Sequence, residues 1–361
     1  MRRRSFLTSA ATGAGAAMVA APAVAEALPA LNWRLASSFP KTLDTIFGAA
    51  DVFTRRVAQL TGGRFQIRAF AGGEIVPGLQ VMDAVQAGTV EMGHTASYYY
   101  FGKDPTFSFD TAMPFGLTSR QQTAWYEQGG GRDLLREFFR GYGVINFLGG
   151  NTGTQMGGWY RKQIKTVADV KGLKIRIAGF AGRVMERMGA VPQQIAGADV
   201  YPALEKGTID AAEWVGPYDD EKLGLAKVAP YYYAPGWWEA GPQLSFYVSI
   251  KEWEKLPKEY QAAIEVASYE AHVVMQAEYD ARNPQALARL LKAGAKLNTF
   301  SKPIMDAAYK FSQEVMDEEA AKNAKFKKIY EPWKRFRQDQ NMWASVAEAQ
   351  MQNYLISVGR K

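Results

Sequence analysis

Residues 173–214 read LKIRIAGFAGRVMERMGAVPQQIAGADVYPALEKGTIDAAEW, and their pattern decides the fold. Apolar and basic residues alternate with a period of two at 173–177, which predicts a β-strand. A short helix, a second strand at 191–195, a helix from Asp199 to Gly207 and a third strand at 208–211 are predicted to follow. This alternation of strands and helices is typical of an open α/β sheet with parallel strands.

Two residues of opposite charge lie at the ends of these strands. Arg176 is near the end of the first strand and Glu213 follows the third, and ligands of parallel α/β sheets bind beyond the carboxyl ends of strands. A guanidinium pairs with a carboxylate in bidentate geometry, and a buried carboxylate such as Glu213 needs a cationic partner. From spacing alone the alternative is that Arg176 shares a solvated strand face with Lys174.

An internal similarity indicates two lobes of one plan. Residues 81–91 (VMDAVQAGTVE) align with residues 200–210 (VYPALEKGTID), and each predicts a helix that is closed by glycine and leads into a strand. Chance is the alternative, because such units are common in α/β proteins. We favour a pseudo-repeat in which each lobe directs one strand end at a shared cleft. His94-Thr95 would then correspond to Glu213-Trp214.

The remaining pattern predicts an α/β architecture of two lobes joined by crossing strands and a long helix. Gly149-Gly150 and Gly241-Pro242 are candidate crossings between the lobes, because hinges need residues that absorb dihedral change. The periodicity at 257–294 predicts one long spine helix. We expect lobe I at 31–150 plus 241–285, lobe II at 151–240 plus 286–330, and C-terminal helices at 331–361. Further strands are expected at 33–36, 65–70, 89–92, 144–148 and 244–250, and further helices at 45–60, 79–87, 120–142, 307–321, 324–336 and 342–358.

The first residues are typical of an export signal. Residues 1–7 (MRRRSFL) precede an Ala/Gly-rich run, and Ala23-Val24-Ala25 forms a cleavage site, which predicts a signal peptide at 1–25 of the twin-arginine type. The chain has no cysteine, which excludes disulfides, thiolate ligands and a lipid-modified cysteine anchor. We therefore expect a protein that is exported to the periplasm.

Charge and motifs exclude several classes of function. Beyond the signal, 40 basic residues face 36 acidic residues without a block of like charge, so nucleic acid is not an expected partner. The sequence lacks a Walker loop, a Gly-x-Ser-x-Gly elbow and a His-Glu-x-x-His motif. The two histidines, His94 and His272, are far apart, and we expect structural roles for both. Residues 219–221 (DDE) are expected as the acidic first turn of a helix.

The chain resembles the solute-binding proteins of TRAP (tripartite ATP-independent periplasmic) transporters over nearly all of its mature length. The family-wide marks are residues 167–176 (VADVKGLKIR), 188–192 (MGAVP) and 203–213 (ALEKGTIDAAE). More specific segments resemble the subgroup that binds 2-oxo acids such as pyruvate, with lactate binders close by. These segments are 35–40 (LASSFP), 98–107 (YYYFGKDPTF), 149–153 (GGNTG), 155–159 (QMGGW) and 213–220 (EWVGPYDD).

The resemblance implies a two-lobed periplasmic-binding-protein architecture, with crossing hinge strands and a long spine helix, whose lobes close over a small carboxylate and a metal cation. Arg176 matches the carboxylate-binding arginine of the family. The Gln155 side chain, the Glu213 carboxylate and the Trp214 backbone carbonyl would hold the cation, which is sodium or, alternatively, calcium. Glu239 matches a further position near the ligand, and the ligand's tail would meet Tyr98, Tyr100, Phe180 and Trp214.

The function implied is capture of a 2-oxo monocarboxylate and its delivery to the membrane permease subunits of a TRAP transporter, without catalysis. Some members of the subgroup dimerise through C-terminal helices, so a homodimer is also implied. One alternative is a periplasmic sensor domain that feeds a signalling partner. Another is an enzyme that uses Glu213 or Glu239 as a general base near a metal, although the sequence lacks a nucleophile–base pair.

Overall fold

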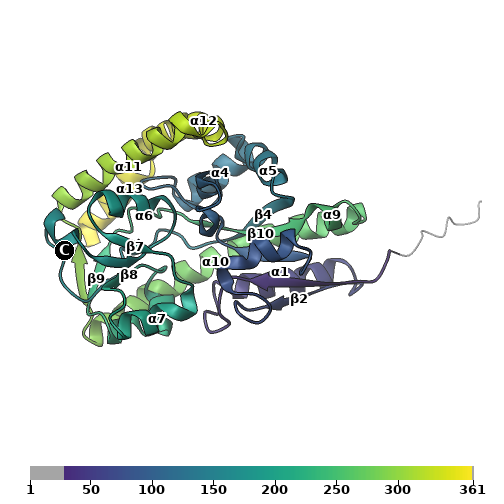
Figure 1. The fold of residues 1–361 in the computed structure, drawn as a ribbon, viewed down its shortest axis with the longest axis horizontal. Coiled ribbons are helices and arrows are strands. Elements are labelled where there is room, and N and C mark those ends of the chain that lie inside the picture. Colours follow the sequence, from purple (N-terminus) through teal and green to yellow (C-terminus); the bar gives the residue numbers. More distant parts are fainter. Residues whose placement is uncertain (1–27, 360–361) are drawn as a thin grey trace, which may run out of the picture.

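Two β-sheets with helices packed around them divide the molecule into two lobes (Figure 1). The computed structural model describes residues 28–359, so the predicted signal peptide lies outside the described residues. The two-lobed α/β architecture is confirmed. The lobe I sheet has the order β2 (Phe65–Phe70), β1 (Leu31–Ser37), β3 (Met92–Thr95), β10 (Gln243–Ser249) and β4 (Val144–Asn151). The lobe II sheet has the order β11 (Lys296–Thr299), β9 (Tyr231–Ala234), β5 (Trp159–Tyr160), β8 (Ala211–Ala212), β6 (Lys174–Arg176) and β7 (Val191–Gln193).

Helices connect and cover these strands. Within residues 28–359 no helix combines the length and the apolar character that a membrane span requires. The helices are α1 (Gly48–Leu60), α2 (Val81–Gln86), α3 (Ser108–Thr111), α4 (Ser119–Gln128), α5 (Gly131–Arg140), α6 (Gly179–Arg187), α7 (Gly197–Glu205), α8 (Pro217–Leu223), α9 (Ile250–Trp253), α10 (Lys258–Lys292), α11 (Lys302–Lys322), α12 (Ala324–Val346) and α13 (Glu348–Gly359).

The pseudo-repeat is present in the backbone hydrogen bonds of both lobes. The N–H groups of Thr89 and Val90 bond to one carbonyl in α2, and those of Thr208 and Ile209 bond to the matching carbonyl in α7. These bonds close each helix and delay the strand that follows. For that reason β3 begins at Met92 and β8 at Ala211, later than the predicted starts.

The acidic residue that ends each repeat bonds to the neighbouring strand in the same way. Glu91 Oε2 accepts the backbone N–H of Arg34 at 2.7 Å, and Asp210 Oδ2 accepts the backbone N–H of Lys174 at 3.1 Å. In both sheets the strand after the repeat pairs in parallel with the strand that supplies this N–H. The two lobes therefore present equivalent strand ends to the space between them.

The long helix α10 spans both lobes as the predicted spine. It packs against α1 and β4 in lobe I and against α8 in lobe II (Figure 1). Gly150 has a φ of 134°, a backbone conformation that favours glycine, and it packs against the flexible end of the Met275 side chain of α10. His94 Nε2 bonds to the Gly149 carbonyl at 2.9 Å and His272 Nδ1 to the Gly150 carbonyl at 3.0 Å. Both histidines thus hold the crossing strand.

Two predicted helices, one in lobe I and one near the C-terminus, differ in extent from the observed ones. The helix predicted at 120–142 is two helices, because Gly130 adopts a left-handed conformation with φ of 80° between α4 and α5. The helix predicted at 324–336 continues to Val346, and α13 follows it. Helix α11 packs against α6 of lobe II, whereas α12 crosses to α4 and α5 of lobe I. The exact lobe boundaries stay a prediction.

A buried carboxylate ties together three segments of lobe I. Asp110 in α3 accepts hydrogen bonds from Ser245 Oγ at 2.6 Å, from Asn146 Nδ2 at 3.0 Å, from Gln243 Nε2 at 3.2 Å and from the Ser97 hydroxyl. Its partners come from the two crossing strands and from the segment before Tyr98. Asp110 therefore fixes the backbone on which part of the cavity wall is built.

Asp110 should make stability depend on pH. Burial raises its pKa from 3.8 to about 6, although hydrogen bonds from Ser245 and Ser97 oppose the rise. Between these values the folded protein holds a proton that the unfolded chain releases. We therefore expect this group's contribution to the free energy of unfolding to fall by about 3 kcal/mol as the pH rises through this window. Urea unfolding of wild type and Asp110→Asn across the window tests this. A difference between the two proteins that stays constant with pH would contradict it.

Candidate functional site

Arg176 is buried at the end of β6, with only 1% of its surface exposed. Its Nε donates to the Ile195 carbonyl at 3.1 Å, its Nη1 donates to the Glu213 carbonyl at 2.8 Å, and it also pairs with the Glu213 carboxylate. The indole of Trp214 lies 4.9 Å from the guanidinium carbon. Lys174 on the same strand is exposed, so the alternative of a shared solvated face does not hold.

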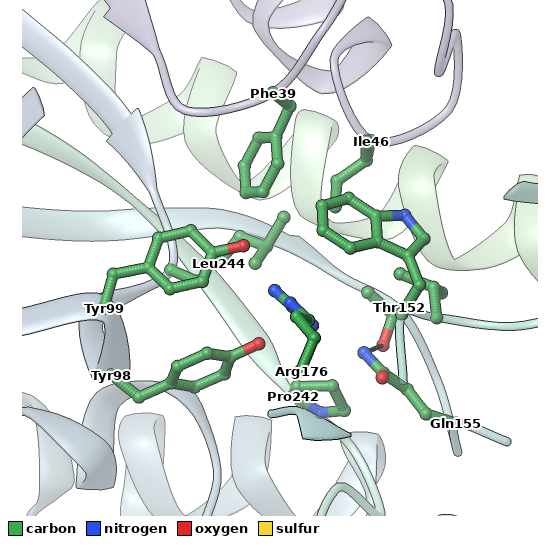
Figure 2. A pocket seen from close by; sticks show the side chains of 12 residues that line it. Phe39, Ile46, Tyr98, Tyr99, Thr152, Gln155, Arg176, Pro242 and Leu244 are labelled. Carbon is green, nitrogen blue, oxygen red and sulfur yellow. Dashed lines mark hydrogen bonds between the residues drawn. The ribbon is translucent and has the colours of Figure 1, made fainter. Parts of the chain in front are cut away.

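Four buried polar atoms at this place have no hydrogen-bond partner among the residues that the structure describes. They are Arg176 Nη2, Glu213 Oε2, Gln155 Oε1 and Glu239 Oε2. The other end of the Gln155 amide donates to Thr152 at 3.1 Å (Figure 2), and the Gln155 backbone N–H donates to the Glu239 carbonyl at 3.0 Å. Buried polar groups are rarely left unpaired, and one donor beside three acceptors suits an anion together with a cation.

The charges of the site favour a bound cation. Burial raises the pKa of Glu213, and the charge of Arg176 opposes this. Burial and the nearby Glu213 raise the pKa of Glu239, again against Arg176. Two buried carboxyl groups thus share one guanidinium. A metal ion beside their free oxygens would supply the missing positive charge, and oxygen ligands suit a hard cation.

The candidate metal ligands are mixed rather than all acidic. Between residues 28 and 359 no group of three His, Cys, Asp or Glu side chains is placed to hold a metal ion. The unpaired buried oxygens are instead those of the Gln155 amide and of the Glu213 and Glu239 carboxyl groups, and Gln155 alone of these three residues lines the cavity. With the backbone carbonyl of Trp214, which the resemblance adds, these oxygens fit sodium or calcium.

A second pair of buried carboxylates supports Trp214 from behind. Asp219 accepts the Trp214 indole N–H at 3.3 Å and the Tyr279 hydroxyl at 2.8 Å, while Asp220 accepts the Trp159 indole N–H at 2.9 Å. Sequence analysis assigned this acidic turn only to the helix dipole. The structure shows that it also fixes Trp214, and through Tyr279 it joins the site to α10.

The cavity between the lobes is small, and the centre of a water molecule can occupy only about 10 Å³ of it. Figure 2 shows Tyr98 and Tyr99 at one side with their hydroxyl groups directed toward Arg176, and Phe39 and Ile46 on the opposite side of the space from Gln155. The wall from lobe I is largely apolar, whereas the wall from lobe II carries the charge. The lining residues are Phe39, Ile46, Ala96, Tyr98, Tyr99, Thr152, Gln155, Arg176, Trp214, Val215, Pro242 and Leu244.

The tail wall differs from the predicted one at two positions. Tyr100 turns away from the cavity, and its hydroxyl bonds to the Met82 N–H at 2.9 Å and to Thr95 at 3.1 Å. Phe180 packs on Phe101 with ring centres 4.9 Å apart. Neither residue lines the cavity. Sequence reasoning missed Phe39, Ile46, Tyr99, Thr152 and Leu244 as lining residues, although Phe39, Tyr99 and Thr152 lie in segments quoted for the resemblance.

The fold and the site together define a solute-binding protein: two α/β lobes enclose a small cavity with one guanidinium for an anion and free oxygens for a cation. The family model for bacterial extracellular solute-binding protein, family 7 (DctP), matches residues 36–323, and the chain belongs to this family of TRAP solute-binding proteins. Members of the family bind solutes rather than act as enzymes. The chain is therefore a TRAP solute-binding protein.

Similar proteins share both sequence and fold with this chain. A protein from Nostoc sp. named monocarboxylate 2-oxoacid-binding periplasmic protein is 51% identical, over 99% of this chain and 100% of its own. A TRAP solute-binding protein from Bordetella bronchiseptica is 53% identical with a TM-score of 0.91, over 92% of this chain and 99% of that chain; its structure is a dimer with copurified calcium and picolinate at one site and an apo second site. A TRAP periplasmic solute-binding protein from Pseudoalteromonas atlantica, with bound sodium and pyruvate, is 40% identical with a TM-score of 0.86. The match covers 90% of this chain and 98% of that chain.

Proposed function

We propose that this protein captures a 2-oxo monocarboxylate such as pyruvate together with a metal cation in the periplasm and delivers it to a TRAP membrane permease. The observation that carries the proposal is the set of unpaired buried atoms around the cavity. Arg176 Nη2 suits the carboxylate of the ligand, and the free oxygens of Gln155, Glu213 and Glu239 suit a cation.

A 2-oxo acid matches this arrangement because it can bind both partners at once. One carboxylate oxygen can face Arg176, while the other and the ketone oxygen on the next carbon can approach the cation. Pyruvate, bound with sodium by the Pseudoalteromonas protein, and picolinate, bound with calcium by the Bordetella protein, each place a donor atom next to a carboxylate. Simple acids such as acetate lack this second donor and should bind less tightly.

The charge on Glu239 determines which ion suits the closed site. With Arg176, an ionised Glu213 and the ligand, a sodium ion gives a neutral cluster if Glu239 holds a proton. If Glu239 is ionised, a divalent ion such as calcium restores neutrality. Burial and the charge of Glu213 raise the pKa of Glu239, which supports sodium at neutral pH, while calcium remains the alternative that would draw Glu239 into its ionised form.

A thermal-unfolding panel tests the ligand class. Metal-stripped protein is heated with pyruvate, 2-oxobutyrate, lactate, acetate or succinate, with and without sodium or calcium. We expect the 2-oxo acids with one cation to raise the midpoint most, because at 100-fold excess over Kd a ligand adds about 3 kcal/mol to stability. A larger rise with acetate or succinate than with pyruvate would refute the proposed ligand class.

We further propose that the protein is a homodimer in which α13 contacts the partner copy. The apolar side chains of α13 are exposed in the single chain, including Met351, Tyr354, Leu355 and Ile356. Contiguous apolar surface of this kind marks interaction sites, and the Bordetella protein forms a dimer. Export by the twin-arginine route is proposed from residues 1–25, which lie outside the described residues.

Removing α13 should convert the dimer into a monomer. A chain that ends at Ala347 loses the exposed apolar helix but keeps the cavity and both sheets. We expect light scattering to give twice the chain mass for the full mature protein and one chain mass for the truncated one, with ligand binding retained in both. Equal masses for the two proteins would contradict the assignment.

A further inference from the structure

The connection between β1 and α1, residues 38–47, reaches from the cavity to its outer edge and is called the lid below. It has no regular secondary structure, yet Phe39 and Ile46 are buried and line the cavity from lobe I (Figure 2). Arg176 approaches the cavity from lobe II. A carboxylate bound to Arg176 therefore directs its carbon tail toward the apolar side chains of the lid.

The outer surface of the lid is fastened to the other side of the cleft. Asp44 forms an ion pair with Lys222 of α8 and accepts the Tyr218 hydroxyl of the same helix at 3.2 Å. Arg282 of the spine helix lies 3.6 Å from Asp44 and donates to the Tyr218 hydroxyl at 2.9 Å. One lobe I carboxylate thus contacts three side chains from lobe II and the spine, and these contacts can form only when the lobes are close together.

Asp44 and its contacts with Lys222, Tyr218 and Arg282 are called the latch. Asp44 lies only two residues before the cavity-lining Ile46 in the lid. Two residues span at most about 7 Å of chain, so a displacement of Ile46 by a bulky tail reaches Asp44 directly. Thr45 between them is buried, and its hydroxyl oxygen accepts a hydrogen bond from Arg282 Nη1 at 3.4 Å. The lid therefore has little freedom to absorb the shift. A tail that pushes Ile46 outward would pull Asp44 away from its partners.

We propose that the lid selects the ligand by tail size: Phe39 and Ile46 contact the tail, and the Asp44 latch converts a good fit into a long-lived closed state. This inference rests on the proposed function and adds the residues that set tail specificity. A short tail leaves the latch intact and slows ligand release. A long branched tail displaces the lid, and the latch then no longer prolongs the closed state.

Removal of the latch should therefore shorten the bound lifetime of short ligands only. The latch residues are partly exposed, so their contacts are screened and individually weak. For Asp44→Asn we expect the dissociation rate of pyruvate to rise about three- to tenfold with an association rate within about twofold of wild type. The dissociation rate of 2-oxoisocaproate should stay unchanged. High salt should raise the dissociation rate of pyruvate from wild type toward that of the variant.

Stopped-flow kinetics on the full mature protein with its cation test this coupling. Asp306→Asn is the matched control, because Asp306 pairs at 2.6 Å with Lys302 on its own helix and cannot report on lobe closure. In an Ile46→Ala background the branched tail fits beneath a closed lid, so Asp44→Asn should now speed release of 2-oxoisocaproate as well. Equal effects of Asp44→Asn on both acids in the wild-type background, or no effect on either, would overturn the proposal.

A ligand-independent measurement separates this proposal from the ligand assignment. The chain has no cysteine, so spin labels at Arg55→Cys in α1 and Lys206→Cys beside α7 report the distance between the lobes without further changes. Without ligand, Asp44→Asn should widen this distance distribution and Asp306→Asn should not. If wild type binds no 2-oxo acid, the proposed function fails. Unchanged distances between the two labels in Asp44→Asn would instead show that Asp44 does not hold the lobes together.

Discussion

Replacing Arg176 by Met should abolish binding of pyruvate, with affinity falling about 100-fold or more. Within residues 28–359, Arg176 is the only guanidinium that lines the cavity, and its Nη2 is the donor left for a ligand carboxylate. Loss of one partner of a buried, hydrogen-bonded charge pair costs about 2–5 kcal/mol or more of binding free energy. Calorimetric titration of the variant with pyruvate measures this loss. Affinity within tenfold of wild type would show that the carboxylate binds elsewhere.

The same change should also lower stability, because Arg176 neutralises Glu213. A buried carboxylate without its partner costs about 3–5 kcal/mol at neutral pH. Changing Glu213 to Gln in the Arg176→Met protein removes that stranded charge. We expect the double variant to regain most of the stability in urea unfolding while it still fails to bind pyruvate. This control separates a lost binding site from a damaged fold.

Glu213→Gln on its own should remove the dependence of binding on the cation. The amide keeps an acceptor for Arg176 but lacks the negative charge by which Glu213 attracts the cation. We expect pyruvate affinity in the presence of sodium or calcium to drop to the level of metal-free wild type. Calorimetric titration with and without each ion measures this, with Glu221→Gln as a control, because Glu221 pairs with Arg289 at the surface.

The stability of the metal-free Glu213→Gln protein, measured by urea unfolding, should also lack the pH dependence that Glu213 gives metal-free wild type. Burial raises the pKa of Glu213, so wild type loses stability as the pH rises above the ordinary value of 4.5 and the buried group must ionise. The neutral amide does not. A variant that still binds pyruvate more tightly with added cation would place the metal away from Glu213.

The alternating segments of the chain were predictable because they follow local rules. Residues 173–214 gave the order of strands and helices, and the glycine-closed repeats placed Glu213 and His94 at matching strand ends. The first residues of β3 and β8 were not predictable, because the turns after Gly88 and Gly207 use backbone hydrogen bonds that the hydrophobic pattern does not show. Strand ends depend on such bonds as much as on periodicity.

The charged centre of the site was predictable from the sequence, whereas much of the tail wall was not. Arg176, Glu213, Gln155 and Trp214 follow quoted motifs, and the structure brings them together. Ile46 reaches the cavity from an irregular segment, a placement that depends on how lobe I faces lobe II. Tyr100 was expected beside the ligand, but its hydroxyl is taken by backbone and side-chain groups of lobe I. Tertiary contacts of this kind leave no periodic signal.

We propose that one buried cluster binds a 2-oxo acid and a cation together. Calorimetric titration of metal-stripped protein with pyruvate, first alone and then with sodium or calcium, tests it most directly. We expect weak binding without metal and at least about tenfold tighter binding with one of the two ions, at one pyruvate per chain. Equal affinity in all three conditions would contradict it.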